Sequence, residues 1–228
     1  VPGLLEADAI YSMFQRMEEN YNSSDLLDAE GPGILRPDDP RSVVGAGSSG
    51  VAEALHVLIV DQTVGDASVS LGLADASSFT DMLADAKKRF PCARLYVKTH
   101  PDVLAGKKKG YLTEEAKRCG AVLIAEDVAP FSLLEQVDVV YCVTSQMGFE
   151  ALMLGKEVYC FGMPFYAGWG LTHDTLSCPR RTKKRTLLEV FAAAYLLYAR
   201  YVNPVTGERC DIHDTIARLS LQREKNEE

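Results

Sequence analysis

Two carboxylates follow the first strongly apolar run of the chain, at the place where a buried strand would end. Residues 57–60 read VLIV, Asp61 comes next, and Asp66 stands a few residues further on. A carboxylate in this position can act as a nucleophile, as a base or as an acceptor for a hydroxyl group. It can equally cap a helix or form a turn. The neighbouring Gln62 and Thr63 add polar groups, and both interpretations stay open.

A cation and an imidazole stand at the end of the second predicted strand, residues 93–101. Lys98 and His100 have the spacing of a strand, so they should share one face, and Pro101 should end the strand. Together they suit a phosphate or a leaving group. The alternative is a buried histidine that bonds to the backbone.

Hydroxyl and amide side chains follow another apolar run, residues 137–143. Thr144, Ser145 and Gln146 open a helical stretch, and Glu150 lies about one turn further on. Free backbone N–H groups and hydroxyls at a helix start suit a phosphate or a base edge, and a carboxylate suits the two hydroxyls of a ribose. A plain capped helix would explain the same residues.

A loop of glycines and aromatics follows the next apolar run. Residues 162–172 read GMPFYAGWGLT and contain Tyr166 and the only tryptophan, Trp169. Glycines let the backbone approach a ligand, and aromatic rings stack on sugars or bases, although a tight turn over core aromatics is the simpler explanation. Arg180 and Arg181 then begin a basic cluster. Such a cluster is usually part of a solvent-exposed face. The more specific alternative is a site that binds an anionic sugar or a lipid phosphate.

The elements that must position these residues alternate between strands and helices. Strands are expected at residues 57–60, 93–101, 121–127, 137–143 and 157–161, and helices at 78–90, 113–119, 129–136 and 147–154, the first capped by Ser77 or Ser78. This alternation predicts an α/β fold with a Rossmann-like, doubly wound parallel sheet. Ligands bind beyond the carboxyl ends of the strands in such sheets, which is where the polar residues gather.

The sequence divides into two parts at about residue 50. Residues 1–50 combine a helical pattern at 9–21 with a stretch rich in Gly, Pro, Asp and Ser at 31–50, which favours a linker or the remnant of a first domain. Residues 51–228 form the predicted nucleotide-sugar-binding domain, with further helices at 186–201 and 214–222. The basic segment 106–110 is interpreted as a surface loop.

Composition excludes several classes of function. A formal charge of -8 argues against general binding to nucleic acid or anionic membranes. We see no signal peptide and no run long enough to cross a bilayer. The six cysteines form no C-x-x-C pair and no His/Cys pair has ligand spacing, so we expect a reducing compartment and no metal site.

Long segments of the chain closely resemble the capsule polysaccharide β-Kdo transferases of the KpsC type. The segments are DQTVGDAS (61–68), VKTHPD (97–102), KKGYL (108–112), VYCVTSQMGFEALMLGKEVYCFG (140–162) and PFYAGWGLT (164–172). Arg180 and Arg181, residues 191–207 and Cys210 continue the match, which spans roughly residues 57–210.

The resemblance implies the nucleotide-binding half of a GT-B-like glycosyltransferase. Such an enzyme would transfer Kdo from CMP-β-Kdo, with retention, to a phosphatidylglycerol-type lipid carrying oligo-Kdo. It would work in the cytoplasm, peripheral to the inner membrane, alongside capsule assembly and export proteins. The resemblance implies no metal and no cofactor beyond the donor CMP-Kdo.

The resemblance also implies roles for individual residues. Asp61 is the first choice for the attacking carboxylate, and Asp66 is the second. Lys98 and His100 would meet the departing phosphate. The residues expected to hold CMP are Thr144, Ser145, Gln146 and Glu150. Those expected to face the Kdo unit or the acceptor are Tyr166, Trp169, Arg180 and Arg181.

Residues 1–55 depart from the family pattern, because a GT-B enzyme needs two Rossmann-like halves with a cleft between them. Two alternatives therefore stand beside the transferase. One is a nucleotide- or glycan-binding module or fragment without catalysis, and the other is a GT-B-type sugar-nucleotide epimerase. Release of CMP from CMP-Kdo with a glycolipid acceptor would select the transferase.

Overall fold

The computed structural model describes residues 54–124 and 130–227 of the 228-residue chain. The helix predicted at 9–21, the linker at 31–50 and the boundary near residue 50 lie outside these residues. The described chain divides into two compact units, one that extends to Lys184 and one that begins at Arg185. Each unit is described by itself.

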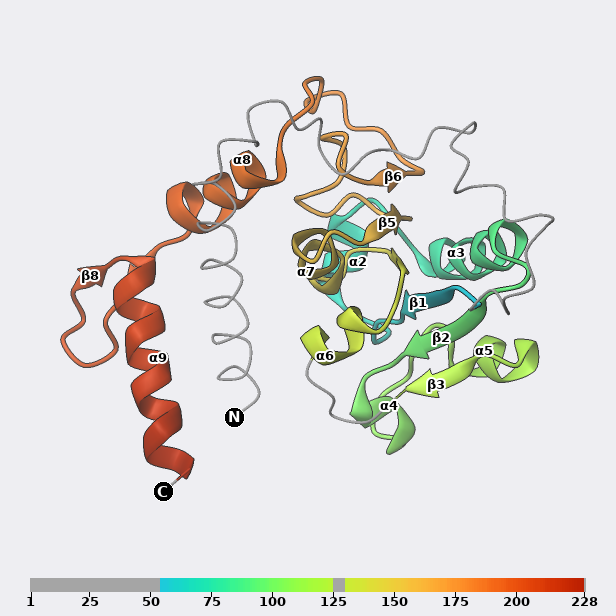
Figure 1. Cartoon of the computed structure of the whole chain (residues 1–228), viewed down its shortest axis with the longest axis horizontal. Helices are drawn as coiled ribbons and strands as arrows, with labels where there is room; N and C mark the ends of the chain where they lie inside the picture. Colours follow the sequence, from blue (N-terminus) through green and yellow to red (C-terminus); the bar gives the residue numbers. More distant parts are fainter. Residues whose placement is uncertain (1–53, 125–129, 228) are drawn as a thin grey trace, which may run out of the picture. The chain divides into compact units, whose positions relative to one another are not determined.

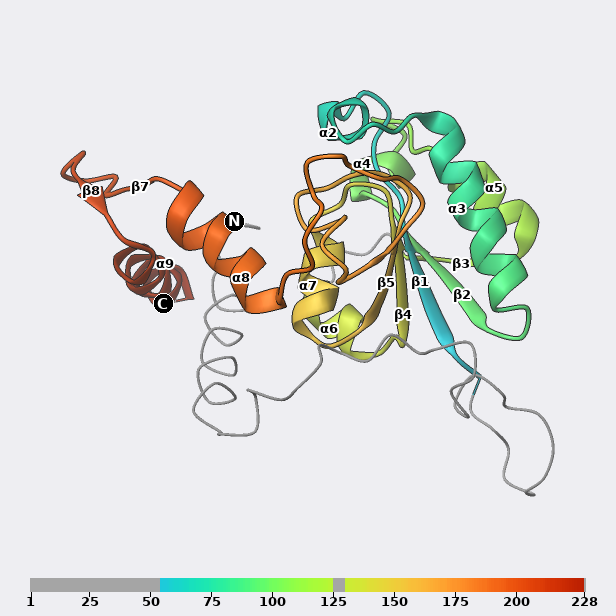
Figure 2. The ribbon, with the colours of Figure 1, turned by 90° about the horizontal axis from the view of Figure 1, so that it is seen from above.

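The first unit is built on a six-stranded parallel sheet, whose strands are labelled in Figure 1 except for β4, which is labelled in Figure 2. Its strands are β1 (His56–Val60), β2 (Arg94–Lys98), β3 (Val122–Ile124), β4 (Val139–Cys142), β5 (Glu157–Cys160) and β6 (His173–Asp174). Their order is β3-β2-β1-β4-β5-β6, with every neighbouring pair parallel. The chain moves outward from β1 to β3 and then returns to the other side of β1 with β4. The predicted doubly wound sheet is confirmed, and its topological switch point lies between β1 and β4.

Helices cover both faces of this sheet, as Figure 2 shows. One face carries α3 (Ala76–Arg89) and α5 (Thr113–Cys119), and the other carries α6 (Pro130–Glu135) and α7 (Met147–Met153). The short helices α2 (Ala67–Leu71) and α4 (Pro101–Leu104) lie at the carboxyl ends of the strands. Because both faces are covered, nearly all successive side chains of β1, β4 and β5 are buried, which explains the continuous apolar runs in the sequence.

A row of rings crosses three strands on the face covered by α3. The register pairs Tyr141 with Tyr159 and Tyr159 with His173, and the ring centroids lie 4.6 Å and 4.4 Å apart. Tyr141 donates to Asp85 of α3 at 2.8 Å, and Tyr159 donates to Glu157 at 2.7 Å. Burial, more than any other cause, raises the pKa of both tyrosines, so their hydroxyls remain donors.

The observed helices can be compared with the predicted helix bounds and capping residues. The predicted helix 113–119 coincides with α5, which ends at Gly120 in the left-handed conformation. α3 begins at Ala76, and its N-cap is Asp75 rather than Ser77 or Ser78. Asp75 accepts from the backbone of both serines, and Ser78 returns a hydrogen bond in a capping box.

The second described unit contains the remaining elements of the chain. They are α8 (Leu187–Phe191), the π-helix η3 (Ala192–Tyr198), the antiparallel pair β7 (Tyr201–Val202) and β8 (Arg209–Cys210), and α9 (Ile212–Glu227). The helix predicted at 186–201 is therefore α-helical only in its first part. None of the helices in the described residues combines the length and the apolar character that a membrane span requires.

The edge strand β6 gives a prediction about pH. His173 Nε2 lies 2.9 Å from a carboxylate oxygen of Glu157, and this hydrogen bond is the largest cause that lowers the pKa of Glu157. A lowered folded-state pKa stabilises the fold above the ordinary value of 4.5, and this stabilisation is lost as the pH falls through the folded-state pKa. We expect Glu157→Gln to cost about 1 kcal/mol near neutral pH and progressively less as the pH falls through the lowered folded-state pKa of Glu157.

Urea unfolding of the wild type and of Glu157→Gln across this pH range measures the difference. Glu114→Gln is the matched control, because Glu114 is exposed and pairs with Lys117 one turn along the same helix. An equal cost for Glu157→Gln at both ends of the range would contradict the prediction.

Candidate functional site

Gln62 joins the carboxyl ends of β1 and β4 at the topological switch point. Its Oε1 accepts from the backbone N–H of Thr144 at 3.0 Å and lies 3.1 Å from the Thr144 hydroxyl. Its amide nitrogen lies 3.0 Å from Asp66 Oδ2, 3.1 Å from Ser68 Oγ and 3.0 Å from Thr144 Oγ1. The structure thus brings Asp66 and Thr144, both predicted from sequence, to one place, and adds Gln62 and Ser68.

Asp66 is a half-buried carboxylate at the start of α2. It is the N-cap of this helix, and its Oδ1 accepts from the backbone N–H of Ser68 at 2.9 Å. Burial by itself would raise the pKa of Asp66, but hydrogen bonds from Ser68 and Gln62 outweigh burial and lower it. Asp66 is therefore ionised at neutral pH and reachable from solvent.

Asp61 occupies a different environment, with only 6% of its surface exposed. Its Oδ1 accepts from the backbone N–H groups of Gln62, Tyr111 and Leu112 at 2.9, 3.0 and 3.2 Å. Thr99 donates to Oδ2 at 3.3 Å. Burial is the largest influence and raises the pKa of Asp61, against these hydrogen bonds. The carboxylate fastens residues 110–112 to the end of β1.

The lysine-rich loop before Tyr111 is anchored as well. Val64 donates to the carbonyl of Lys109 at 2.7 Å, and Thr63 forms a bridge with Gly110. A Cβ at Gly110 would lie 2.3 Å from Asp61 Oδ2, so a larger residue would displace the carboxylate. The surface loop expected from sequence is thus held against the end of β1 at its carboxyl-terminal side.

His100 and Lys98 stand at the end of β2. His100 is exposed and caps α4, because its Nδ1 accepts from the backbone N–H of Asp102 at 3.1 Å. This acceptor role places the imidazole proton on Nε2. Lys98 is the last residue of β2, and Lys108 Nζ lies 3.4 Å from the Asp102 carboxylate. His100, Lys107 and Lys108 therefore surround the Asp102 carboxylate.

The turn into α7 carries the other predicted nucleotide-binding residues. Ser145 Oγ accepts from the backbone N–H of Met147 at 3.3 Å, Gln146 is exposed, and Glu150 is buried in the first turn. A serine that caps through its own hydroxyl and a carboxylate in the first turn both favour the helix itself. Gln146 is the member of this group that faces solvent.

Tyr166 supports this turn from inside the protein. Its ring is fully buried, its hydroxyl donates to the carbonyl of Ser145, and Cys142 Sγ lies 3.3 Å away. A Cβ at Gly148 would lie 2.1 Å from the Tyr166 hydroxyl oxygen. Direct contact between Tyr166 and a sugar, as the resemblance implied, does not fit this burial. The ring instead holds the Ser145 turn.

Arg181 and Trp169 belong to the glycine loop. The Arg181 guanidinium donates to the carbonyls of Pro164 and Ala167 and lies 5.4 Å from the centre of the Trp169 ring. Arg181 thereby shapes the loop, while Trp169 stays partly exposed and Arg180 is exposed. Of the residues predicted to face the sugar or acceptor, Trp169 and Arg180 remain the accessible ones.

Two glycines close around the methyl group of Thr144. A Cβ at Gly72 would lie 2.2 Å from Thr144 Cγ2, and a Cβ at Gly162 would lie 3.0 Å from it. Met163 donates to the carbonyl of Gly72 at 2.7 Å. The segments that follow β1, β4 and β5 therefore pack on one another without intervening space.

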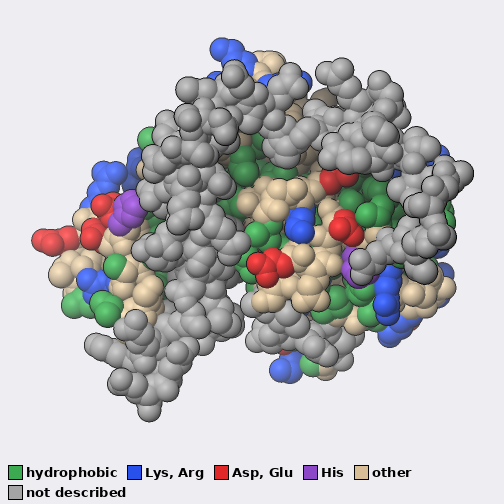
Figure 3. Space-filling model, viewed as in Figure 1, with side chains coloured by type: hydrophobic (Ala, Val, Ile, Leu, Met, Phe, Trp, Pro, Cys, Tyr) green, Lys and Arg blue, Asp and Glu red, His purple; other side chains and the backbone are tan. Residues whose placement is uncertain are grey.

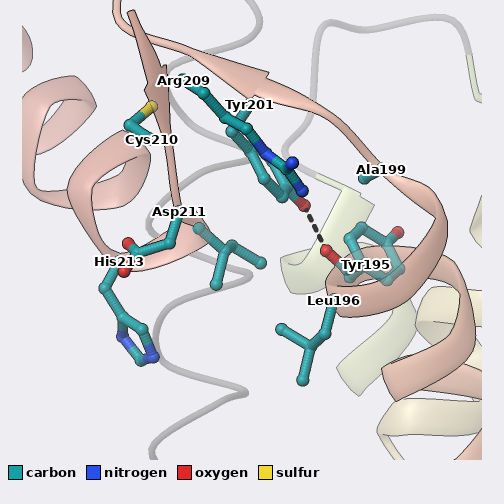
Figure 4. Close-up of a pocket in the computed structure, with 9 residues that line it drawn as sticks. Tyr195, Leu196, Ala199, Tyr201, Arg209, Cys210, Asp211 and His213 are labelled. Atoms are coloured by element: carbon teal, nitrogen blue, oxygen red, sulfur yellow. Dashed lines mark hydrogen bonds between the residues drawn. The ribbon is translucent and has the colours of Figure 1, made fainter.

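Other surfaces of the described chain carry less chemistry. A hollow of about 310 Å³ lies in the second unit, where Tyr201 donates to the carbonyl of Tyr195 (Figure 4). None of the site residues predicted from sequence lines it. In Figure 3 acidic and basic side chains are interspersed over the described part of the visible face. Within residues 54–124 and 130–227, no cluster of His, Cys, Asp and Glu could hold a metal ion.

The model of the capsule polysaccharide biosynthesis protein family matches residues 50–209. The chain belongs to this family. It is 52% identical over 177 residues to the capsule polysaccharide modification protein LipA of Neisseria meningitidis serogroup B, a match that covers 75% of this chain and 25% of LipA. It is 41% identical over 168 residues to the lipopolysaccharide-processing protein LpsZ of Rhizobium meliloti, covering 74% of this chain and 38% of LpsZ.

Two solved structures of Thermosulfurimonas dismutans KpsC are similar to this capsule biosynthesis protein. The β-Kdo 2,4 transferase is 53% identical with a TM-score of 0.68, and the match covers 76% of this chain and 55% of that one. The β-Kdo 2,7 transferase is 32% identical with a TM-score of 0.62, covering 75% and 55%. The resemblance to KpsC-type proteins and the α/β fold class are confirmed. The chain spans about a quarter of LipA and about half of each solved chain.

The two aspartates of this capsule biosynthesis protein should differ in what they contribute to stability. Asp61→Ala removes the acceptor of three backbone N–H groups, and we expect a loss of about 3 kcal/mol. Asp66→Ala removes a half-exposed helix cap, and we expect a loss of about 1 kcal/mol. Denaturant unfolding measures both, and equal losses would contradict the assignment of Asp61 to the framework.

Proposed function

We propose that this chain forms the donor-binding part of a retaining β-Kdo transferase of capsule polysaccharide biosynthesis. The donor is CMP-Kdo and the acceptor is a lipid-linked, phosphatidylglycerol-type oligo-Kdo. The observation that carries the proposal is the ionised, reachable Asp66 beside Thr144 at the topological switch point. The similarity to two Kdo transferases supports the same substrate class.

The nucleotide binds beyond the carboxyl ends of β1, β2 and β4. Gln146 and the backbone of the Ser145 turn contact the CMP portion, and Glu150 reinforces the start of α7. His100 presents its Nε2–H toward the leaving phosphate, and Lys98 adds positive charge at the same strand end. The exposed side chains of His100 and Gln146 can reach a ligand without rearrangement of the core.

The attacking carboxylate is Asp66 rather than Asp61. A nucleophile must be ionised and must reach the anomeric carbon. The lowered pKa and partial exposure of Asp66 meet both requirements, whereas three backbone N–H groups occupy Asp61 Oδ1 inside the protein. A carboxylate oxygen of Asp66 forms an ester with the anomeric carbon as CMP departs with the bonding electrons. The acceptor hydroxyl then displaces that carboxylate and loses its proton to solvent. Two inversions give overall retention.

Binding without turnover is the second candidate function, favoured by one observation. The chain spans only about half of each solved KpsC chain, and a GT-B enzyme closes its cleft between two halves. Saturable binding of CMP without release of CMP from CMP-Kdo would select this alternative. In either case we propose that the protein acts in the cytoplasm, at the periphery of the inner membrane and next to capsule assembly and export proteins.

The mechanism predicts the effect of one substitution on catalysis. Asp66→Asn keeps the shape of the residue and removes its charge, so we expect Kdo transfer to fall at least about a thousandfold while CMP affinity changes less than about threefold. Transfer is measured by CMP release with a glycolipid acceptor, and affinity by titration calorimetry. The matched control is Asp75→Asn, a helix N-cap one helix further along. Retained transfer by Asp66→Asn would exclude Asp66 as the nucleophile.

The similarities also predict the linkage. Identity is 53% with the β-Kdo 2,4 transferase and 32% with the β-Kdo 2,7 transferase. We therefore expect the chain, in its complete protein, to form the 2,4 linkage. Nuclear magnetic resonance of the oligosaccharide product determines the linked position, and a 2,7 product would contradict this prediction.

A further inference from the structure

We propose that Gln62 is a positioning residue that orients the Asp66 carboxylate and links it to the turn that follows β4. The inference rests on the proposed function, in which Asp66 attacks the donor and the turn after Thr144 binds CMP. It adds a residue that touches neither the nucleotide nor the sugar. Its argument comes from the hydrogen bonds that meet at the Gln62 amide.

Both oxygens of Asp66 are held from different directions. The backbone N–H of Ser68 donates to Oδ1 at 2.9 Å, and the Gln62 amide lies 3.0 Å from Oδ2. Ser68 belongs to the helix that Asp66 caps, whereas Gln62 follows strand β1. A carboxylate bound at both oxygens keeps one orientation, and a reacting group gains rate from such fixed geometry.

Thr144 decides which way the Gln62 amide faces. Its backbone N–H can only donate, so the atom that faces it at 3.0 Å must be the carbonyl oxygen of Gln62. The NH₂ group of Gln62 must then point toward Asp66. The opposite orientation would set two donors against each other at Thr144 and two acceptors against each other at Asp66. The backbone of the β4 turn therefore directs a donor at the reacting carboxylate.

Gln62 influences the pKa of Asp66. Burial raises the pKa of Asp66, and hydrogen bonds from Ser68 and Gln62 lower it. Loss of the Gln62 donor should therefore raise the pKa of Asp66. A negative charge placed at the Gln62 position should raise it further.

The test compares Gln62→Glu and Gln62→Leu with the wild type in the full chain. Gln62→Glu replaces the donor with a carboxylate oxygen, and Gln62→Leu removes the donor without adding charge. Gln136→Glu is the matched control, because Gln136 is exposed and its amide donates to the carbonyl of Ser132. Carboxyl-carbon nuclear magnetic resonance gives the pKa of Asp66 in each variant, and this measurement needs no turnover.

We expect the pKa of Asp66 to rise by about one to two units in Gln62→Glu and by about half a unit in Gln62→Leu, with no change in Gln136→Glu. The acid limb of kcat/KM for Kdo transfer should move up by the same amounts. In Gln62→Leu, kcat should fall about tenfold while KM for CMP-Kdo stays nearly constant. A purely structural role would lower stability without this ranked shift of the pKa.

An unchanged Asp66 pKa in both Gln62 variants overturns the inference and leaves the proposed function standing. If the wild type binds CMP but transfers no Kdo, the proposed function fails, and the same titration still decides the role of Gln62. If Gln62→Glu does not fold, the comparison of Gln62→Leu with the wild type is the test. A pKa in Gln62→Leu equal to that of the wild type then rejects the proposal.

Discussion

The interaction on which the site depends is the hydrogen-bonded contact between Gln62 and Thr144. The doubly wound order of the strands brings the ends of β1 and β4 together, although 82 positions of sequence separate these two residues. The connections that follow β1 and β4 run to opposite sides of the sheet at this point. Side chains that follow the two strands can therefore meet beyond the strand ends. Ser68 and Asp66 join the same contact from the start of α2. Strand topology, more than any local motif, assembles the carboxylate and the turn.

The two aspartates of one short motif show how environment separates the roles of identical side chains. Burial raises the pKa of Asp61, and its hydrogen bonds with backbone N–H groups make it part of the framework. Partial exposure and donors from Ser68 and Gln62 lower the pKa of Asp66. Pairs of carboxyl groups with opposite shifts commonly have different tasks in one site. Asp61 also holds the backbone N–H of Gln62, so the framework carboxylate positions the residue that contacts Asp66.

The sheet could be predicted because strands such as β1 and β4 are apolar runs bounded by polar residues. Other features gave no local signal. α2 was not predicted, because Val69 is the one buried residue among its five. Asp75 was missed as a cap because two serines follow it. The roles of Gln62 and Ser68 depend on Thr144, far away in the sequence, and no spacing rule reveals that contact. The burial of Tyr166 depends on Gly148 and Cys142 in the same way.

The described site combines a tightly held part with an accessible part, and the division follows from packing. Gly72 and Gly162 leave no room around Thr144, and Arg181 holds the glycine loop through two carbonyl groups. These contacts lock the ends of β1, β4 and β5 together, because any larger side chain or shift would produce overlap. His100 and Gln146 lie on the exposed side of this framework. A carboxylate that must reach one carbon atom benefits from rigidity, whereas groups that meet a phosphate can adapt to it. The arrangement gives each group the mobility that its proposed task requires.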